Sequence, residues 1–235
     1  MQQFLGKEYK ISLHYRKYEG KTKMKEKVKE FIVKNLKWII LFICLIGFLA
    51  IAEDVFNKEI MNGDIVGYKL ISTFLISDFA TPIAKFITNF GGAIFLAVLT
   101  IILFILIKNK KIGVSILSNL VMITALNQLL KNILQWPRPT EYRIIEETGY
   151  SFPSGHSMIS MAFYGYLIYL IYKYVKNKYV KWISMALLSL LICSIGISRI
   201  YLGVHYTSDV LGGFLISISY LVIYISAVNK FLIEK

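Results

Sequence analysis

The sequence predicts an all-α, polytopic membrane protein with six transmembrane helices. The chain has 235 residues, of which 56% are hydrophobic and only 17% are charged, and its mean hydropathy is +0.59. The apolar residues are gathered in six runs whose lengths approach the roughly 20 residues that a bilayer-spanning helix needs. Because backbone polar groups in lipid must be satisfied within their own segment, a single helical membrane domain over residues 31–235 accounts for all six runs.

The first and fourth of the six runs are short, whereas the others have spanning length on their own. Residues 31–37, with snorkelling lysines, extend the first run, and residues 154–175 contain the fourth. The six runs, in chain order, are residues 38–52, 86–107, 112–130, 158–172, 182–202 and 210–228.

The net charge of +13 is distributed along the chain in a way that predicts a membrane orientation and no nucleic-acid partner. Residues 7–37 hold eleven Lys and Arg against four Asp and Glu, whereas residues 53–85 hold three lysines against five acids. The connections at 108–111 and 173–181 are again rich in lysine. By the positive-inside rule, both termini are predicted to be cytoplasmic, with residues 1–30 forming a basic N-terminal segment beside the membrane.

Ionisable residues at the ends of the apolar runs indicate a candidate site, because charge at membrane depth is costly. In the segment 198–209, His205 and Asp209 are four residues apart and share a face if a helix begins near His205. The carboxylate could then hold a proton on one ring nitrogen and leave the other free as a base or nucleophile. Arg199 adds a permanently charged guanidinium whose N–H groups suit phosphate or carboxylate.

Other ionisable residues lie at run ends on the same predicted side of the membrane. Lys131 closes the third run, and Arg138 lies in the proline-rich connection after it. Residues 153–156 resemble a helix N-terminus capped by Ser154, where free N–H groups and the helix dipole favour an anion. With Arg199, the two cations would stabilise a phosphoryl group, while one histidine attacks phosphorus and another protonates the leaving oxygen.

The segments 131–139, 153–156 and 198–209 resemble the three-part signature of the type 2 phosphatidic acid phosphatase (PAP2) superfamily in order and spacing. The resemblance implies a PAP2-like helical bundle and a hydrolase that needs no metal and no cofactor. It also implies that His205 is the nucleophile of a phosphohistidine intermediate, that Asp209 orients it, and that His156 is the acid for the leaving group. The phosphate-binding residues that it implies are Lys131, Arg138, Ser154, Gly155 and Arg199.

The same resemblance implies a lipid phosphatase of the bacterial plasma membrane, with an extracytoplasmic site and a substrate whose tail stays in the bilayer. The substrate is open among undecaprenyl diphosphate, phosphatidylglycerophosphate and phosphatidic acid. The lysine- and isoleucine-rich composition is typical of an AT-rich bacterial genome, and a bacterial source favours the first two. A lipid phosphotransferase of the same family is one alternative. A non-catalytic protein that binds or transports a lipid phosphate is another. The sequence carries no signal for the oligomeric state.

Ser154 could alternatively be the nucleophile of an intramembrane protease, but its surroundings are not G-x-S-x-G and the three cations suit phosphate better. Three charged residues of the connection after the third run, Arg143, Glu146 and Glu147, are expected to be solvated. Gating of the site or contact with a head group is the alternative for these three.

Overall fold

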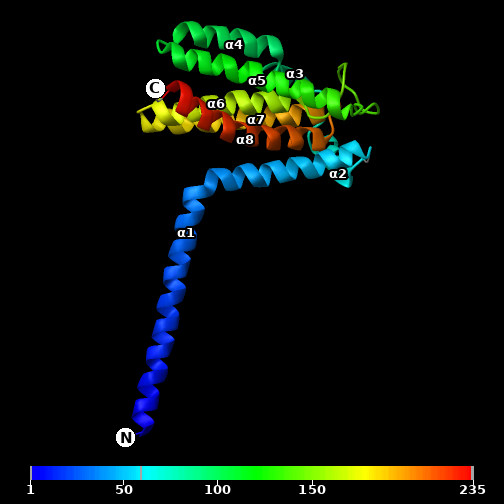
Figure 1. Cartoon of the computed structure of the whole chain (residues 1–235). Helices are drawn as coiled ribbons and strands as arrows, with labels where there is room; N and C mark the ends of the chain where they lie inside the picture. Colours follow the sequence, from blue (N-terminus) through cyan, green and yellow to red (C-terminus); the bar gives the residue numbers. More distant parts are fainter. Residues whose placement is uncertain (1, 59, 234–235) are drawn as a thin grey trace. The chain divides into compact units, whose positions relative to one another are not determined.

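The computed structural model describes residues 2–58 and 60–233, with side chains described for residues 25–58 and 60–231. Within that part of the chain the regular structure is helical and contains no strand, which confirms the predicted all-α class. The helices in Figure 1 are α1 (Gln2–Phe56), α2 (Asn62–Phe74), α3 (Ala80–Asn89), α4 (Ala93–Leu106), α5 (Lys110–Leu134), α6 (Gly155–Tyr174), α7 (Lys178–Tyr201), α8 (Thr207–Val228) and the terminal π-helix η1 (Asn229–Ile233).

The chain divides into two compact units, one up to Ile40 and one from Leu41. Within the first unit the described backbone belongs to α1, so the basic segment predicted at residues 1–30 is helical from residue 2. The side chains of residues 1–24 lie outside the described residues, and the role expected for them stays a prediction. Residues 31–40 are mostly exposed and belong to the first unit. The second unit begins at Leu41, ten residues after the start predicted for the membrane domain.

Four of the described helices are long and apolar enough to cross a membrane: α1 from Lys25, α5, α7, and α8 together with the start of η1. The pair α3 and α4 is a fifth candidate, although its two halves are bent by 49°. Helix α6 contains several serines and tyrosines and is not among these candidates. The integral membrane character is therefore supported, whereas the count of six spanning helices stays a prediction.

The second apolar run is not the single helix that was predicted over residues 86–107. Helix α3 begins at Ala80 and ends at Asn89, and α4 begins at Ala93 after two consecutive glycines. A Cβ atom on Gly91 would lie only 2.8 Å from the side chains of both Ser160 and Ile195. Glycine at this break therefore lets the chain lie directly against α6 and α7.

Helix α6 packs against α5, α7 and α8, and several of its polar side chains lie inside the bundle. The Tyr164 hydroxyl donates to the Phe90 carbonyl at 2.7 Å, and the Tyr166 hydroxyl donates to the Ser115 hydroxyl at 2.7 Å. Both tyrosines are buried, and a buried hydroxyl is stabilised by such a partner. The polar residues that lower the hydropathy of α6 thus connect it to neighbouring segments.

Two sets of hydrogen bonds stabilise the end of the bundle where the predicted motifs lie. Between α5 and α6, the Ser151 amide donates to the carbonyl of the buried Trp136 at 2.7 Å. Helix α2 reaches the start of α8 through the buried Asp64, which accepts hydrogen bonds from the Ser208 amide at 2.7 Å and from the Ser208 hydroxyl at 3.1 Å. A carboxylate at a helix N-terminus is favoured by the dipole, so Asp64 stabilises the start of α8.

Candidate active site

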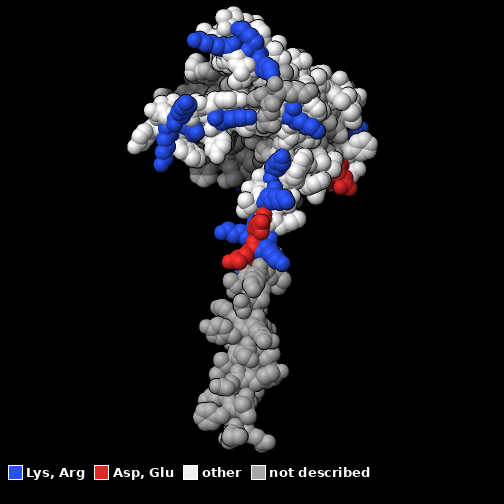
Figure 2. All heavy atoms as spheres, turned by 60° about the vertical axis from the view of Figure 1, so that its left-hand side comes forward, with Lys and Arg blue, Asp and Glu red and all other residues white. Residues whose placement is uncertain are grey.

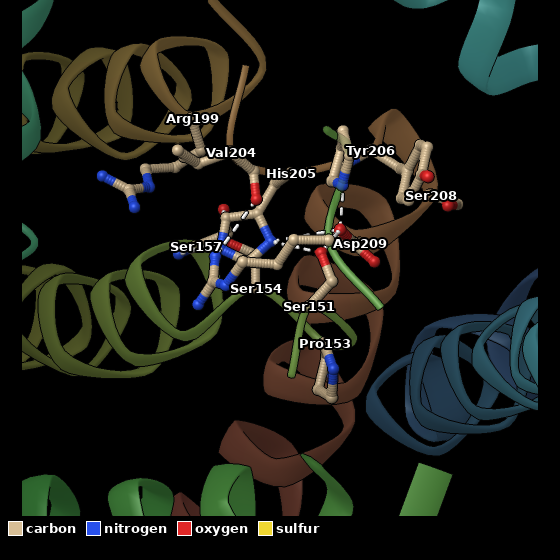
Figure 3. A network of polar contacts seen from close by, with 12 residues as sticks. Ser151, Pro153, Ser154, Ser157, Arg199, Val204, His205, Tyr206, Ser208 and Asp209 are labelled. Atoms are coloured by element: carbon tan, nitrogen blue, oxygen red, sulfur yellow. Dashed lines mark hydrogen bonds and ion pairs between the residues drawn. The ribbon is translucent and has the colours of Figure 1, made fainter. Parts of the chain in front are cut away.

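The three predicted motif segments meet at one end of the helical bundle. Lys131 lies in the last turn of α5, residues 153–156 lead into α6, and Arg199 lies in the last turn of α7. His205 follows in the short connection after α7, and Asp209 lies in the first turn of α8. Figure 3 shows the side chains of this network gathered around His205.

His205 and Asp209 form a buried pair in which Nδ1 of the imidazole lies 3.1 Å from Oδ2 of the carboxylate. The same Oδ2 accepts a hydrogen bond from the Tyr206 amide at 2.8 Å and another from the Ser151 hydroxyl. The Ser151 hydroxyl also lies 3.1 Å from Nδ1 of the imidazole. The predicted juxtaposition of histidine and aspartate is therefore present, although α8 begins at Thr207 and not at His205.

This pairing determines which ring nitrogen of His205 is available for chemistry. A proton on Nδ1 is donated to the carboxylate of Asp209, which leaves a lone pair on Nε2. Burial, followed by the charges of Arg199 and Arg138, holds the pKa of His205 well below its ordinary value. The imidazole is therefore neutral at pH 7, and a neutral Nε2 can act as a nucleophile or as a base.

Arg138 is held beside this imidazole by backbone carbonyls. Its Nη1 donates to Nε2 of His205 at 3.0 Å and to the Val204 carbonyl at 3.1 Å, so the lone pair of Nε2 accepts this hydrogen bond until a phosphoryl group takes its place. Its Nε donates to the Gly149 carbonyl and its Nη2 to the Thr148 carbonyl, each at 3.0 Å. The guanidinium is thus positioned to donate to an oxygen of any group that becomes bonded to Nε2.

Lys131 and Arg199 are two further buried cations of the same cluster. The Lys131 ammonium donates to the carbonyls of Tyr150 and Ser151, the latter at 3.0 Å. Arg199 is 1% exposed, and its Nη1 donates to the Thr88 hydroxyl at 2.8 Å, but its buried Nε has no partner among the described residues. Because an unpaired buried donor is costly, a phosphate oxygen that accepted from this Nε would be strongly favoured.

Glu147 does not lie in solvent as expected, because it pairs with Arg199. Its Oε1 accepts a hydrogen bond from Nη2 of Arg199 at 2.5 Å, and its side chain is 28% exposed. Burial alone would raise the pKa of this carboxyl, but the hydrogen bond and charge of Arg199 outweigh burial and the pKa is lowered. Glu147 is therefore ionised at pH 7, and its carboxylate accepts from an N–H group of Arg199 that could otherwise donate to a phosphate.

The other two charged residues of this connection differ from each other. Arg143 is only partly exposed, contrary to expectation, and its Nε donates to the Pro139 carbonyl at 2.6 Å. Glu146 is exposed as expected, and its carboxylate lies 3.8 Å from the Arg143 guanidinium. An exposed pair at that distance contributes little to stability.

The substitution Glu147→Gln is expected to tighten the binding of inorganic phosphate. Glutamine keeps the size of the side chain but has no charge, so the anion no longer competes with a carboxylate for Arg199. At pH 7 the Kd for phosphate should fall about tenfold, equivalent to ~1.4 kcal/mol, as measured by isothermal titration calorimetry in detergent. Glu146→Gln is the matched control and should change this Kd by less than about twofold. Unchanged or weaker binding by Glu147→Gln would contradict the competition.

Residues 153–156 form the predicted helix N-terminus, with Ser154 as the cap of α6. The Ser154 hydroxyl accepts hydrogen bonds from the Ser157 amide at 3.4 Å and from the Ser157 hydroxyl at 3.0 Å. Its own amide donates to the Asp209 carbonyl at 3.0 Å, which ties α6 to α8. A Cβ atom on Gly155 would lie 3.2 Å from the Asn127 side-chain oxygen. The capping role of Ser154 is confirmed, whereas contact of Ser154 and Gly155 with phosphate stays a prediction.

His156 lies in the first turn of α6, partly buried, within electrostatic reach of Arg199 and Glu147. A Cβ atom on Gly91 would approach its ring to 3.2 Å, so the break between α3 and α4 lines one side of the imidazole. Burial, followed by the neighbouring cations, opposes protonation of this ring. A phosphate dianion bound among them would reverse that effect and favour the imidazolium.

Sequence reasoning missed two residues of this cluster, Ser151 and Thr88, and expected a third, Glu147, to be solvated. Ser151 contacts both members of the His205–Asp209 pair, and Thr88 and Glu147 each hold one nitrogen of Arg199. The position of Ser151, just before the segment 153–156, was a usable signal. Thr88 had none, because it precedes Arg199 by 111 residues in the chain.

The chain is similar in sequence to a family of known proteins. The family model of the PAP2 superfamily matches residues 112–233, about half of the chain. Phosphatidylglycerophosphatase B of Bacillus subtilis is 40% identical over 93 residues, which cover 38% of this chain and 44% of that protein. Undecaprenyl-diphosphatase of Sulfolobus acidocaldarius is 26% identical over 195 residues, which cover 78% of this chain and 86% of that protein.

Two solved structures share the arrangement of helices. The crystal structure of the transmembrane PAP2-type phosphatidylglycerolphosphate phosphatase from Bacillus subtilis has a TM-score of 0.70 and 26% identity, and the match covers 81% of this chain and 96% of that one. The crystal structure of LpxE from Aquifex aeolicus has a TM-score of 0.55 and 27% identity, covering 68% of this chain and 92% of that one.

Proposed function

The chain belongs to the PAP2 superfamily, and on this premise we propose that it is a membrane lipid phosphatase that hydrolyses a lipid phosphate or diphosphate. The observation that carries the proposal is the buried imidazole of His205, held by Asp209 and bordered by Arg138, in surroundings that lower its pKa. A neutral nitrogen nucleophile beside fixed cations suits attack on a phosphoryl group, whose charge the cations stabilise in the transition state.

In the proposed reaction, Nε2 of His205 attacks phosphorus. The proton on Nδ1 stays on the ring and is hydrogen-bonded to Asp209, whose charge offsets the positive charge that develops on the imidazole. The P–O bond to the lipid breaks, and His156 donates its proton to the departing oxygen. A water molecule then attacks the phosphohistidine, with His156 now accepting the proton, and inorganic phosphate leaves. Throughout both steps Lys131, Arg138 and Arg199 neutralise the oxygens of the phosphoryl group.

The proposed substrate classes are undecaprenyl diphosphate, phosphatidylglycerophosphate and phosphatidic acid. The names of two relatives, a phosphatidylglycerophosphatase and an undecaprenyl-diphosphatase, favour the first two. All three lipids present a terminal phosphate that the same cations could bind.

The proposed orientation has cytoplasmic termini and an extracytoplasmic site. Exposed lysines mark the α4–α5 and α6–α7 connections, which lie at the end of the bundle opposite His205. Figure 2 shows Lys and Arg side chains over that end, and the described residues 108–111 and 173–181 include no acidic residue. A lysine-rich end is the one that the positive-inside rule assigns to the cytoplasm.

Phosphate release from a lipid panel tests the proposed function. The purified protein in detergent micelles would receive undecaprenyl diphosphate, phosphatidylglycerophosphate and dioleoyl phosphatidic acid, each labelled in its terminal phosphate. A phosphatase releases labelled inorganic phosphate from at least one of them. Transfer of the label to another lipid without release would identify a phosphotransferase, and binding with neither reaction would identify a non-catalytic lipid-phosphate binder.

A further inference from the structure

A cavity opens beside His205, on the side formed by α2. Its volume is about 400 Å³, and it is lined by residues of α2, of the α5–α6 connection and of the segment around His205. Ile65 and Tyr68 come from α2, Tyr142 from the α5–α6 connection and Ile200 from the end of α7. We call this cavity the tyrosine pocket, because the rings of Tyr68 and Tyr142 form one of its walls.

The tyrosine pocket differs in chemistry from the phosphate-binding cluster. Most of the side chains around it are apolar or aromatic, and its acidic members are Asp64 and Glu141. None of the described residues that line it is a lysine or an arginine. A phosphate is therefore better stabilised by Lys131, Arg138 and Arg199, while the pocket suits an uncharged carbon chain.

The tyrosine wall is supported by ring stacking and by backbone contacts, and Tyr142 is 56% exposed. The two rings stack with their centroids 4.7 Å apart and their planes 19° apart. The Tyr142 backbone lies against Gly203, whose φ is +69°, and a Cβ atom there would lie 2.0 Å from the Tyr142 carbonyl oxygen. Two residues after Tyr142, the Ile144 amide donates to the Leu202 carbonyl at 3.0 Å. A pre-organised wall of this kind can discriminate between ligands at little cost in ordering.

Helix α2 also presents exposed apolar side chains next to this pocket. Ile65, Val66, Leu70 and Phe74 are each more than half exposed, and Ile65 lines the pocket itself. Exposed apolar side chains on a short helix suit the boundary between lipid head groups and acyl chains. A lipid whose phosphate lies at His205 could therefore pass its first carbons through the pocket and its tail over α2.

We propose that the tyrosine pocket receives the uncharged carbons that directly follow the scissile phosphate, so that Tyr68 and Tyr142 determine which lipid phosphates are accepted. This inference rests on the proposed function and deepens it. Of the three proposed classes it favours the monoesters, phosphatidylglycerophosphate and phosphatidic acid, because in these the carbons directly follow the scissile phosphate and would lie among Ile65, Tyr68 and Tyr142.

The test compares one phosphate with and without an acyl chain. Dioleoyl phosphatidic acid in mixed micelles and soluble glycerol 3-phosphate carry the same phosphate ester, and only the former has a chain. Removing one ring in Tyr142→Ala or Tyr68→Ala should lower kcat/KM for phosphatidic acid about tenfold, mainly through KM. The value for glycerol 3-phosphate should change by less than about twofold, because it does not fill the pocket.

Three further variants keep the test decisive if the alanine variants fold poorly. Ile65→Trp narrows the pocket from an exposed position and should also reduce selectivity for phosphatidic acid. Tyr142→Phe retains the stacked ring and should retain selectivity. Tyr179→Ala removes a tyrosine that is 79% exposed at the start of α7 and is the matched control.

The outcomes separate this inference from the proposed function. An unchanged ratio between the two substrates in Tyr142→Ala and Ile65→Trp would overturn the pocket assignment alone, provided the wild-type protein releases phosphate. Equal losses on both substrates would overturn it as well, since they indicate general damage to the site. No release from any lipid by the wild-type protein would overturn both proposals.

Discussion

His205→Asn is expected to abolish turnover and, with it, the covalent phosphoenzyme. Asparagine can keep a hydrogen bond near Asp209, but its amide nitrogen has no lone pair that can attack phosphorus. Phosphate release should fall by at least about 10³-fold, the scale on which loss of a nucleophile is felt. The measurement is rapid quenching with a lipid labelled in its terminal phosphate, followed by detection of an acid-labile label on the wild-type protein only.

The chain offers a matched control for this substitution, because its third histidine, His14, lies in the basic N-terminal segment. His14→Asn should leave both turnover and labelling unchanged. Full turnover in His205→Asn would exclude a phosphohistidine at this position. Labelling that persisted without turnover would place the nucleophile elsewhere in the cluster.

His156→Gln should slow the reaction to an extent that depends on the leaving group. A lipid alcohol is a poor leaving group and needs a proton as the P–O bond breaks, whereas nitrophenolate can depart without one. Loss of a general acid typically costs about 10²–10⁴-fold, so we expect a loss of this size for phosphatidic acid and a loss below about tenfold for nitrophenyl phosphate. Steady-state kcat/KM values for the two substrates provide the measurement.

The comparison with His205→Asn distinguishes the two histidines, because a variant without its nucleophile loses activity on both substrates. Equal losses on both substrates in His156→Gln would contradict the assignment of His156 as the acid. They would indicate that its imidazole acts in binding or in local structure. Ser160→Ala, which changes another polar side chain packed against Gly91, is the control for disturbance of that contact.

The sequence was sufficient to predict the helical class and the juxtaposition of the motif residues, for physical reasons. Apolar runs of spanning length require helices, and lysine-rich connections assign alternate helix ends to opposite sides. Residues at corresponding ends of antiparallel neighbours must then lie close together, as Lys131, Arg199 and His205 do. Whether these residues bind phosphate stays a prediction that the substitutions above can test.

Features that depend on contacts between distant segments could not be predicted in this way. The break of the second run reflects packing of Gly91 against α6 and α7, which periodicity does not reveal. Glu147 has the sequence context of a solvated loop residue, and only the fold brings it to Arg199. The tyrosine pocket joins α2 to two later connections, and neither Tyr68 nor Tyr142 lies in one of the three motif segments.

The glycine break between α3 and α4 has a consequence for how residue importance is judged in this chain. Gly91 carries no reactive group and lies far in sequence from the three motif segments, yet a methyl group there would meet Ser160, Ile195 and the ring of His156. A mutational scan scored by activity would therefore group this position with the catalytic residues. Only a separate assay of folding or of ligand binding could tell a group that reacts from one that leaves room for it.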